Sequence, residues 1–261
     1  INWNFAQFER SNNGYSNFHQ SISEVGNPPI INSKGNFKWN LRWLRYLYLR
    51  ERLFSVFGSN QLETINTIVD IGGCYGGYLT LLAGTLPNKS YTIIDLGENL
   101  PLAAYYISNT LKNKKVTVIN KNTDEVCLDN NSINLIPAHL FKVVKDSEFD
   151  LCCNFVSLGE MSMKHYSEYI NSNLYKNSRY KHLVNRISSS PSYLRDTTFS
   201  YTNSQSILDY EISDKVKFFD IFPLTLFFPL IESSKYLPIY PKLKSLNSFI
   251  KPWRRVSVSS Q

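Results

Sequence analysis

The sequence lacks a long hydrophobic run and carries only four cysteines, and both shortages exclude classes of protein. None of its stretches approaches the roughly 20 apolar residues that a membrane-spanning helix needs, so we expect no transmembrane segment. The four cysteines form neither a zinc-binding pattern nor the framework of a disulfide-rich secreted domain. Two of them, Cys152 and Cys153, lie in a predicted core strand, which favours buried free thiols in a reducing compartment and therefore a cytoplasmic protein.

Runs of like charge and internal repeats are missing too. Without a run of basic residues we expect no nucleic-acid partner. The net charge of +7 would nevertheless suit another anionic partner, such as a membrane surface, a nucleotide-sugar or a polyanionic glycan, or would serve only as a solvated basic surface. Hydrophobic residues make up 43% of the chain and charged residues 19%, which predicts a sizeable folded core.

The pattern of the 261 residues divides the chain into three parts. Residues 1–60 are predicted to form an N-terminal helical segment that caps the main domain. Residues 61–235 show the alternation of strand and helix patterns that defines this main domain, and residues 236–261 are predicted to be an irregular basic tail. The sequence begins at Ile1 and not at a methionine, which leaves open whether a segment precedes it.

Residues 37–57 are predicted to form a long amphipathic helix that ends at Gly58. Arginines alternate with its apolar residues, among them Arg42 and Arg45. We favour a helix that packs on the main domain with its arginine stems lying along the surface. The alternative is a cap over a ligand pocket or a basic rim for phosphate.

The clearest local pattern is a strand, a tight turn and a helix start within residues 67–86. A β-branched run at 67–71 contains Asp70 near its end and is predicted to be a buried strand. Helix-like apolar spacing begins at about residue 77. Glycine lets such a turn adopt positive φ and approach a ligand closely. The turn between strand and helix is rich in glycine: Gly72, Gly73, Gly76 and Gly77.

A second acid at the end of a second strand strengthens this pattern. Residues 90–95 form another β-branched run, and Asp95 is its last member, about 20 residues past the glycine turn. A carboxylate in that position can accept hydrogen bonds from ribose hydroxyls. The two linked motifs therefore predict a nucleoside site, and Asp95 alone does not distinguish one nucleoside cofactor from another.

The remaining alternation predicts an α/β fold with a mainly parallel sheet and helices on both faces. Ligands of such sheets bind outside the carboxyl ends of the strands, so Asp70, Asp95, His139 and residues 154–160 should converge there. Residues 216–228 are strand-like and contain Pro223, which indicates an edge, a bend or a break. The other predicted strands are 116–119, 132–136, 149–156 and 182–187, and the helices are 77–86, 98–111 and one that ends near 174.

The stretch from Asp70 to Gly76 resembles motif I of class I S-adenosylmethionine (SAM) methyltransferases, with Cys74 where the middle glycine is expected. The order of segments over roughly residues 20–190 is similar to that of sugar O-methyltransferases associated with surface-polysaccharide genes. The resemblance implies a Rossmann-like sheet, SAM as cofactor, and a sugar, nucleotide-sugar or glycan as acceptor. A late strand pair would also suit this sheet.

The resemblance places the cofactor at the glycine turn and at the ends of the next strands. In this sequence Pro137, Ala138 and His139 stand where many such enzymes carry an acid for the adenine ring, so we expect His139 to contact the base. The residues predicted to bind the cofactor are Asp70, Gly72, Gly73, Tyr75, Gly76, Asp95, Leu96, His139 and Asn154.

O-methylation needs a base for the hydroxyl proton, and Glu160 is the first candidate because it lies just past a central strand. His165 is the second, although a surface position on a helix would also explain it. Glu160 could equally be a carboxylate that stabilises a helix N-terminus. We predict no metal, because the clustered acids around Asp150 precede a strand and lie at the wrong end of the sheet.

Two other functions fit parts of the pattern. A Rossmann-like binding or scaffold protein without catalysis would explain Cys74 within motif I. An NAD(P)-dependent enzyme acting on a sugar would use Asp95 in the same way. The absence of a clear Gly-x-Gly-x-x-Gly pattern and the acid before the turn count against NAD(P).

Overall fold

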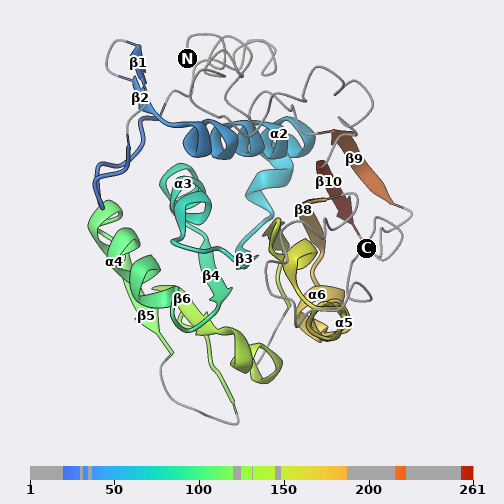
Figure 1. Ribbon diagram of the computed structural model, residues 1–261. Helices are drawn as coiled ribbons and strands as arrows, with labels where there is room; N and C mark the ends of the chain where they lie inside the picture. Colours follow the sequence, from blue (N-terminus) through green and yellow to red (C-terminus); the bar gives the residue numbers. More distant parts are fainter. Residues whose placement is uncertain are drawn as a thin grey trace, which may run out of the picture.

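The computed structural model describes residues 20–29, 32–34, 37–119, 125–130, 132–144, 148–186, 215–221 and 254–260. Its main feature is an eight-stranded sheet in the order β5-β6-β4-β3-β7-β8-β10-β9 (Figure 1). The parallel strands are β3 (Thr67–Ile71), β4 (Ser90–Asp95), β5 (Lys115–Val118), β6 (Ser132–Pro137), β7 (Leu151–Phe155) and β8 (Tyr180–Arg186). The last two strands are β9 (Val216–Ile221) and β10 (Arg254–Ser260), and β10 runs antiparallel to both of its neighbours.

Helices cover both faces of the sheet, as the alternation in the sequence predicted. One face packs against α2 (Leu41–Glu63), α3 (Gly77–Thr85) and α4 (Leu100–Thr110). The other face packs against the 3-10 helices η1 (Ala138–Val143) and η2 (Ser157–Glu160) and against α5 (Met163–Ile170) and α6 (Asn173–Lys176). The predicted α/β, Rossmann-like fold is therefore confirmed. None of the helices that the structure describes is long and apolar enough to cross a membrane.

The alternation of side chains along β3 shows how the sheet separates its two cores. Ile68 lies in the core beneath α2–α4, whereas Val69 and Ile71 lie in the core beneath η1, α5 and α6. Because side chains alternate across a strand, Asp70 lies on the same face as Ile68. The buried thiols of Cys152 and Cys153 divide between the two cores in the same way, and both are free, as predicted.

The N-terminal helix differs from its predicted boundaries. Phe37–Trp39 form strand β2, which pairs with β1 (Asn32–Lys34), so the helix begins only at Leu41. Asn40 caps it, because its side chain accepts a hydrogen bond from the Trp43 N–H at 2.9 Å. Gly58 interrupts the helix with φ 66° and ψ 169°, and a further helical stretch continues to Glu63. Sequence reasoning had placed the end of the helix at Gly58.

The C-terminal residues also differ from the prediction. Arg254–Ser260 were expected in an irregular tail, but they form β10 between β8 and β9. Hydrogen bonding to two neighbours supplies the order that the local sequence does not indicate. The rest of the predicted tail, the strand-like residues 222–228 and residues 1–19 lie outside the described residues. The domain boundaries stay a prediction.

The topology fixes where a ligand can bind. From β3 the chain passes to β4 on one side, and later to β7 on the other side of β3. The connections therefore diverge at β3 and β7, which leaves a crevice outside the carboxyl ends of these strands. In Figure 1 the carboxyl ends of β3 and β4 lie between the α3–α4 side and the α5–α6 side of the molecule.

Candidate active site

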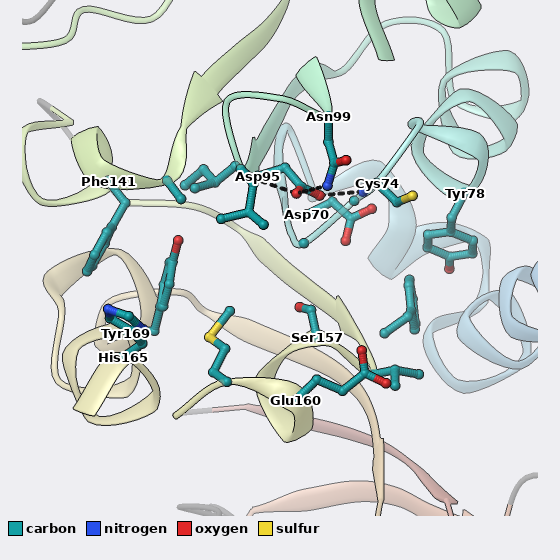
Figure 2. Close-up of a pocket in the computed structure, with 18 of the residues that line it drawn as sticks. Asp70, Cys74, Tyr78, Asp95, Asn99, Phe141, Ser157, Glu160, His165 and Tyr169 are labelled. Carbon is teal, nitrogen blue, oxygen red and sulfur yellow. Dashed lines mark hydrogen bonds between the residues drawn. The ribbon is translucent and has the colours of Figure 1, made fainter. Parts of the chain in front are cut away.

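A cavity of about 1080 Å³ opens at this crevice. The glycine turn after β3, the end of β4, the segment after β7 and the N-terminal part of α2 all contribute to its lining. Figure 2 shows Asp70, Asp95 and Cys74 grouped at the turn, with Ser157 and Glu160 opposite and Phe141 and Tyr169 at the far end. A volume of this size exceeds what a nucleoside alone requires and leaves room for a second substrate.

The glycine turn brings backbone close to the segment after β7. Gly72 has φ 72°, and a Cβ at this position would overlap the side chain of Ser157. Cys74 adopts φ 53° without being a glycine, so the turn forms although motif I is irregular here. Asp70, Gly72 and Gly73 all line the cavity, and their predicted contact with a cofactor stays a prediction. Glycine at 72 is thus required both by conformation and by space.

The side chain of Asp95 accepts hydrogen bonds from backbone N–H groups and so fixes the glycine turn. Its Oδ2 accepts a hydrogen bond from the Cys74 N–H at 2.6 Å, and its Oδ1 accepts from the Leu96 N–H and the Asn99 amide, each at 2.7 Å. A carboxylate can accept about four hydrogen bonds. About one acceptor position of Asp95 therefore remains for a ligand hydroxyl.

Protein acceptors satisfy most of the N–H groups of the turn. The Gly72 N–H donates to the Ile94 carbonyl at 2.7 Å, and the Gly76 N–H donates to the Gly73 carbonyl at 2.9 Å. The Cys74 N–H is taken by Asp95. A turn that binds pyrophosphate directs such N–H groups at the ligand. Here the N–H groups of Gly72, Cys74 and Gly76 are bonded to protein acceptors instead.

Asp70 is an unusual carboxylate in this setting. It is 2% exposed, and its Oδ1 has no hydrogen-bond partner among the described residues. Burial, together with the nearby charge of Asp95, raises the pKa of Asp70 well above its usual value. An unpartnered carboxylate in a low-dielectric site is costly, and a positively charged ligand group would remove that cost.

Three of the predicted cofactor residues, Tyr75, Gly76 and Asn154, are not among the residues that line the cavity. The Tyr75 ring packs edge-on against Tyr106, with ring centroids 4.9 Å apart. Asn154 is fully buried, and its amide donates to the Ile71 carbonyl at 2.7 Å and to Ser157. These contacts stabilise the turn and the segment after β7 from outside the cavity lining.

The other predicted residues lie in the lining, at different ends of the cavity. Leu96 and His139 are exposed in the cavity beyond β4 and β6. In Figure 2, Glu160 extends below Ser157, while His165 lies beside Tyr169 at the other end. The His165 Nδ1 is 3.2 Å from the hydroxyl of Ser162, which caps α5. Their predicted roles as bases stay predictions.

Two aromatic residues at the far end were missed by sequence reasoning. Phe141 from η1 and Tyr169 from α5 stack with ring centroids 4.1 Å apart and an interplanar angle of 19°. Lys142 and Glu168 flank this pair with an ion pair of 3.4 Å. No local pattern marks these positions, because helices far apart in the sequence bring the rings together.

Val156 carries backbone strain at the edge of the cavity. It follows β7, lines the cavity and has φ 77° and ψ −31°. A β-branched residue rarely adopts this conformation, which costs on the order of 1–3 kcal/mol. Its N–H donates to the Val184 carbonyl at 2.7 Å, so the neighbouring strand fixes the conformation.

We expect Val156→Gly to be more stable than Val156→Ala by about 1 kcal/mol, because only glycine relieves the positive φ. Both variants lose the same packing of the valine methyl groups. Urea unfolding at neutral pH measures the difference. The matched pair Val69→Gly and Val69→Ala, in regular strand β3, should show the opposite order. Equal stability of the two variants at position 156 would contradict the strain assignment.

Among the residues that the structure describes, no group of three or more His, Cys, Asp and Glu side chains could hold a metal ion. Asp150, which the sequence placed at the opposite end of the sheet, accepts hydrogen bonds from the N–H groups of Asn66 and Thr67 at 2.7 and 3.1 Å. It therefore connects β7 to the start of β3.

No protein-family model matches the sequence, and no curated protein matches it. Among solved structures, the chain is similar to the methyltransferase domain of bacterial CtHen1-C, with 12% identity, a TM-score of 0.47 and coverage of 85% of this chain and 99% of that chain. It is also similar to the plantazolicin methyltransferase BpumL in complex with a monoazolic desmethylPZN analogue and SAH (16% identity, TM-score 0.46, coverage 84% and 85%). A third is the S-adenosylmethionine-dependent methyltransferase SibL in its apo form (12% identity, TM-score 0.43, coverage 99% and 69%). Identities this low do not transfer a ligand or an acceptor, so function has to be argued from the site.

Proposed function

We propose that this protein is a SAM-dependent O-methyltransferase whose acceptor is a sugar hydroxyl on a nucleotide-sugar or a glycan. The observation that carries the cofactor assignment is the pair of carboxyl groups at the turn, because the Oδ1 of Asp70 has no hydrogen-bond partner among the described residues. Asp70 and Asp95 stand together at a turn whose N–H groups at Gly72, Cys74 and Gly76 already have protein acceptors. This arrangement suits a cation and is unfavourable for a phosphate.

SAM fits this charge pattern better than NAD(P) does. Its methionine part carries an ammonium group and its sulfur is a sulfonium, whereas the part of NAD(P) that meets a glycine turn is an anionic pyrophosphate. The unpartnered Oδ1 of Asp70 gives an ammonium group an acceptor.

The rest of the cavity accommodates a nucleoside. The remaining acceptor position of Asp95 is assigned to a ribose hydroxyl. We assign Leu96 and His139 to the adenine ring, because Leu96 directly follows β4 and His139 lies just after the neighbouring strand β6. Leu96 is 55% exposed, which leaves a large apolar surface for a ligand to cover.

SAM, when bound, supplies a methyl group on an activated sulfonium. The protein then has to position the acceptor hydroxyl and remove its proton, and positioning contributes much of the rate in such transfers. Glu160 lines the cavity on the side of Ser157 and is assigned as the base. A base of this kind contributes about 10²–10⁴-fold. The sugar acceptor rests on the resemblance of the sequence to sugar O-methyltransferases.

Calorimetric titration of SAH and NADH into the purified chain tests the cofactor. We expect SAH to bind with micromolar affinity and NADH not to bind. Asp95→Ala should weaken SAH binding at least about 10-fold, because the turn loses its anchor and the ribose loses an acceptor. Wild-type affinity in that variant would remove the ribose assignment. Tight binding of NADH, or no SAH binding by folded protein, would overturn the proposal.

A second measurement tests the reaction. With SAM present, a panel of nucleotide-sugars and glycans is screened for formation of SAH, and Glu160→Gln is compared with the wild type. We expect turnover to fall by two or more orders of magnitude in the variant while its SAH affinity is unchanged. SAH binding without any turnover would favour a binding or scaffold protein.

A further inference from the structure

The N-terminal part of α2 presents two arginines to the cavity. Arg42 and Arg45 are one helical turn apart and both belong to its lining. The opposite side of this part of the helix is anchored in the core through Trp43, Leu44 and Leu47, which are between 0% and 2% exposed. The helix therefore has no freedom to rotate the arginines away, and their position over the cavity is built into the fold.

The two arginines concentrate positive charge at the start of α2. Arg42 lies in the first turn of α2, where the helix dipole is unfavourable for a cation. Arg45 is half-buried, and this burial, together with the charge of Arg42, lowers its pKa to about 10. A bound anion would favour both charged guanidinium groups, because an opposite charge nearby stabilises the charged form of a group.

An aromatic cluster supports Arg42. The Arg42 guanidinium lies 5.8 Å from the centre of the Tyr75 ring, which itself packs against Tyr106. Tyr46, also in the lining, is 5.9 Å from Tyr78 and 6.4 Å from Tyr75 between ring centroids. Guanidinium groups on a rigid aromatic support are preorganised to bind planar or tetrahedral oxyanions through two hydrogen bonds.

The cavity is divided in charge. Asp70 and Asp95 lie at the turn and Glu160 lies opposite, whereas Arg42 and Arg45 enter from α2. Phe155, Val184 and Leu49 supply apolar lining as well. An acceptor that carries an anion at one end and a hydroxyl at the other would place its anion at α2 and its hydroxyl nearer Glu160.

We infer that Arg42 and Arg45 form a binding site for an anionic group, phosphate or carboxylate, carried by the methyl acceptor. The inference rests on the proposed function for the identity of the second substrate. It narrows the acceptor to anionic sugars, such as nucleotide-sugars or uronic-acid units, and excludes neutral sugars as the preferred class. The same chemistry could instead serve the carboxylate of the cofactor, and the experiment separates these two sources.

The probes are inorganic pyrophosphate and glucuronate, titrated into SAH-loaded protein, with glucose as the uncharged comparison. We expect at least one anion to bind and glucose not to bind. Arg42→Gln and Arg45→Gln should each weaken anion binding about 10-fold or more, and Arg45→Lys should retain part of it. Arg52→Gln is the matched control, because Arg52 lies on the same helix with its guanidinium 5.2 Å from the Tyr48 ring and outside the cavity lining.

The source of the anion is tested with two nucleosides. SAH and 5′-methylthioadenosine differ in the amino-acid part, so an arginine that binds the cofactor carboxylate would affect only SAH. We expect both affinities to be unchanged in Arg42→Gln and Arg45→Gln. A loss confined to SAH would overturn the acceptor assignment. Equal anion binding by all variants, or none by the wild type, would overturn the site itself.

These results are separable from the test of the cofactor. If SAH binds and the anions do not, the inference fails and the proposed function stands. If pyrophosphate binds to the free protein through the arginines while SAH does not bind, the anion site stands and the proposed function fails. Arg42 is exposed, so Arg42→Gln keeps the test valid should the more buried Arg45 prove necessary for folding.

Discussion

Asp70→Asn is expected to weaken SAH binding by about 10- to 100-fold and to raise the melting temperature of the free protein. The loss follows from the hydrogen bond between a carboxylate and an ammonium group, which contributes about 1.5–3 kcal/mol. The gain follows from the removal of a buried carboxyl group whose ionisation the folded state disfavours. One substitution thus moves affinity and stability in opposite directions, which a residue with a purely structural role would not do.

The sign of the stability change comes from the raised pKa. Burial and the charge of Asp95 raise the pKa of Asp70 in the folded state above its unfolded value near 3.8. This shift penalises folding as pH rises above the unfolded pKa, because the unfolded chain ionises there while the folded carboxyl stays protonated. The penalty grows no further once the folded carboxyl has ionised. At neutral pH the amide avoids this penalty. A gain of about 1 kcal/mol would raise the melting temperature by about 2–4 °C.

The same raised pKa makes cofactor binding depend on pH. An ammonium group favours the ionised form of Asp70, so binding should release a proton wherever the free protein is still protonated at this site. Affinity for SAH should therefore rise with pH until Asp70 is ionised. Calorimetry in buffers of different ionisation enthalpy counts the protons released, up to one per ligand, and Asp70→Asn should release none.

Asp150→Asn is the matched control for these measurements. Asp150 is also an aspartate at a strand end, but it lies at the opposite edge of the sheet and accepts backbone hydrogen bonds from Asn66 and Thr67. Its replacement should lower stability and leave SAH affinity unchanged. If Asp70→Asn destabilised the protein as Asp150→Asn does, or bound SAH normally, the assignment of Asp70 to a ligand cation would be wrong.

The central part of the fold was predictable because its local patterns and its tertiary environment agree. Residues 67–71 and 90–95 are β-branched runs bounded by turn residues, and the structure places β3 and β4 over the same residues. The position of the ligand crevice followed from topology alone. It brought Asp70, Asp95 and His139 together in one cavity, although they lie on three separate segments.

The parts that could not be predicted depend on contacts between distant segments. Residues 254–260 form strand β10 because they pair with β8 and β9, which are distant in the sequence. Phe141 and Tyr169 meet through the packing of η1 and α5. Asn154 was expected to contact a ligand, but its amide bonds the end of β3, because a strand-end side chain can face the neighbouring backbone as well as the crevice. Sequence periodicity contains no information on these choices.

A buried histidine beneath the cavity makes the stability of the fold sensitive to acid. His182 of β8 is fully buried, and its Nδ1 is 3.4 Å from the hydroxyl of Tyr78. Its Nε2 has no hydrogen-bond partner within the described part of the chain, and the Phe155 ring packs edge-on at 5.2 Å between centroids. Burial lowers its pKa from 6.5 to about 3. The folded state therefore holds the neutral imidazole.

We expect the wild type to lose about 2 kcal/mol more stability between pH 7.5 and pH 5.0 than His182→Gln does. The unfolded chain binds a proton at this histidine below about pH 6.5, whereas the folded chain does not bind it until about pH 3. As the pH is lowered through this interval, the free energy of unfolding therefore decreases by about 1.4 kcal/mol per pH unit. Urea unfolding at the two pH values measures the loss. Ile93→Val, a core variant that removes no titratable group, should be less stable at both values with the wild-type difference between them. An equal acid dependence in wild type and His182→Gln would mean that water reaches His182 and that its burial beneath Tyr78 and Phe155 is incomplete.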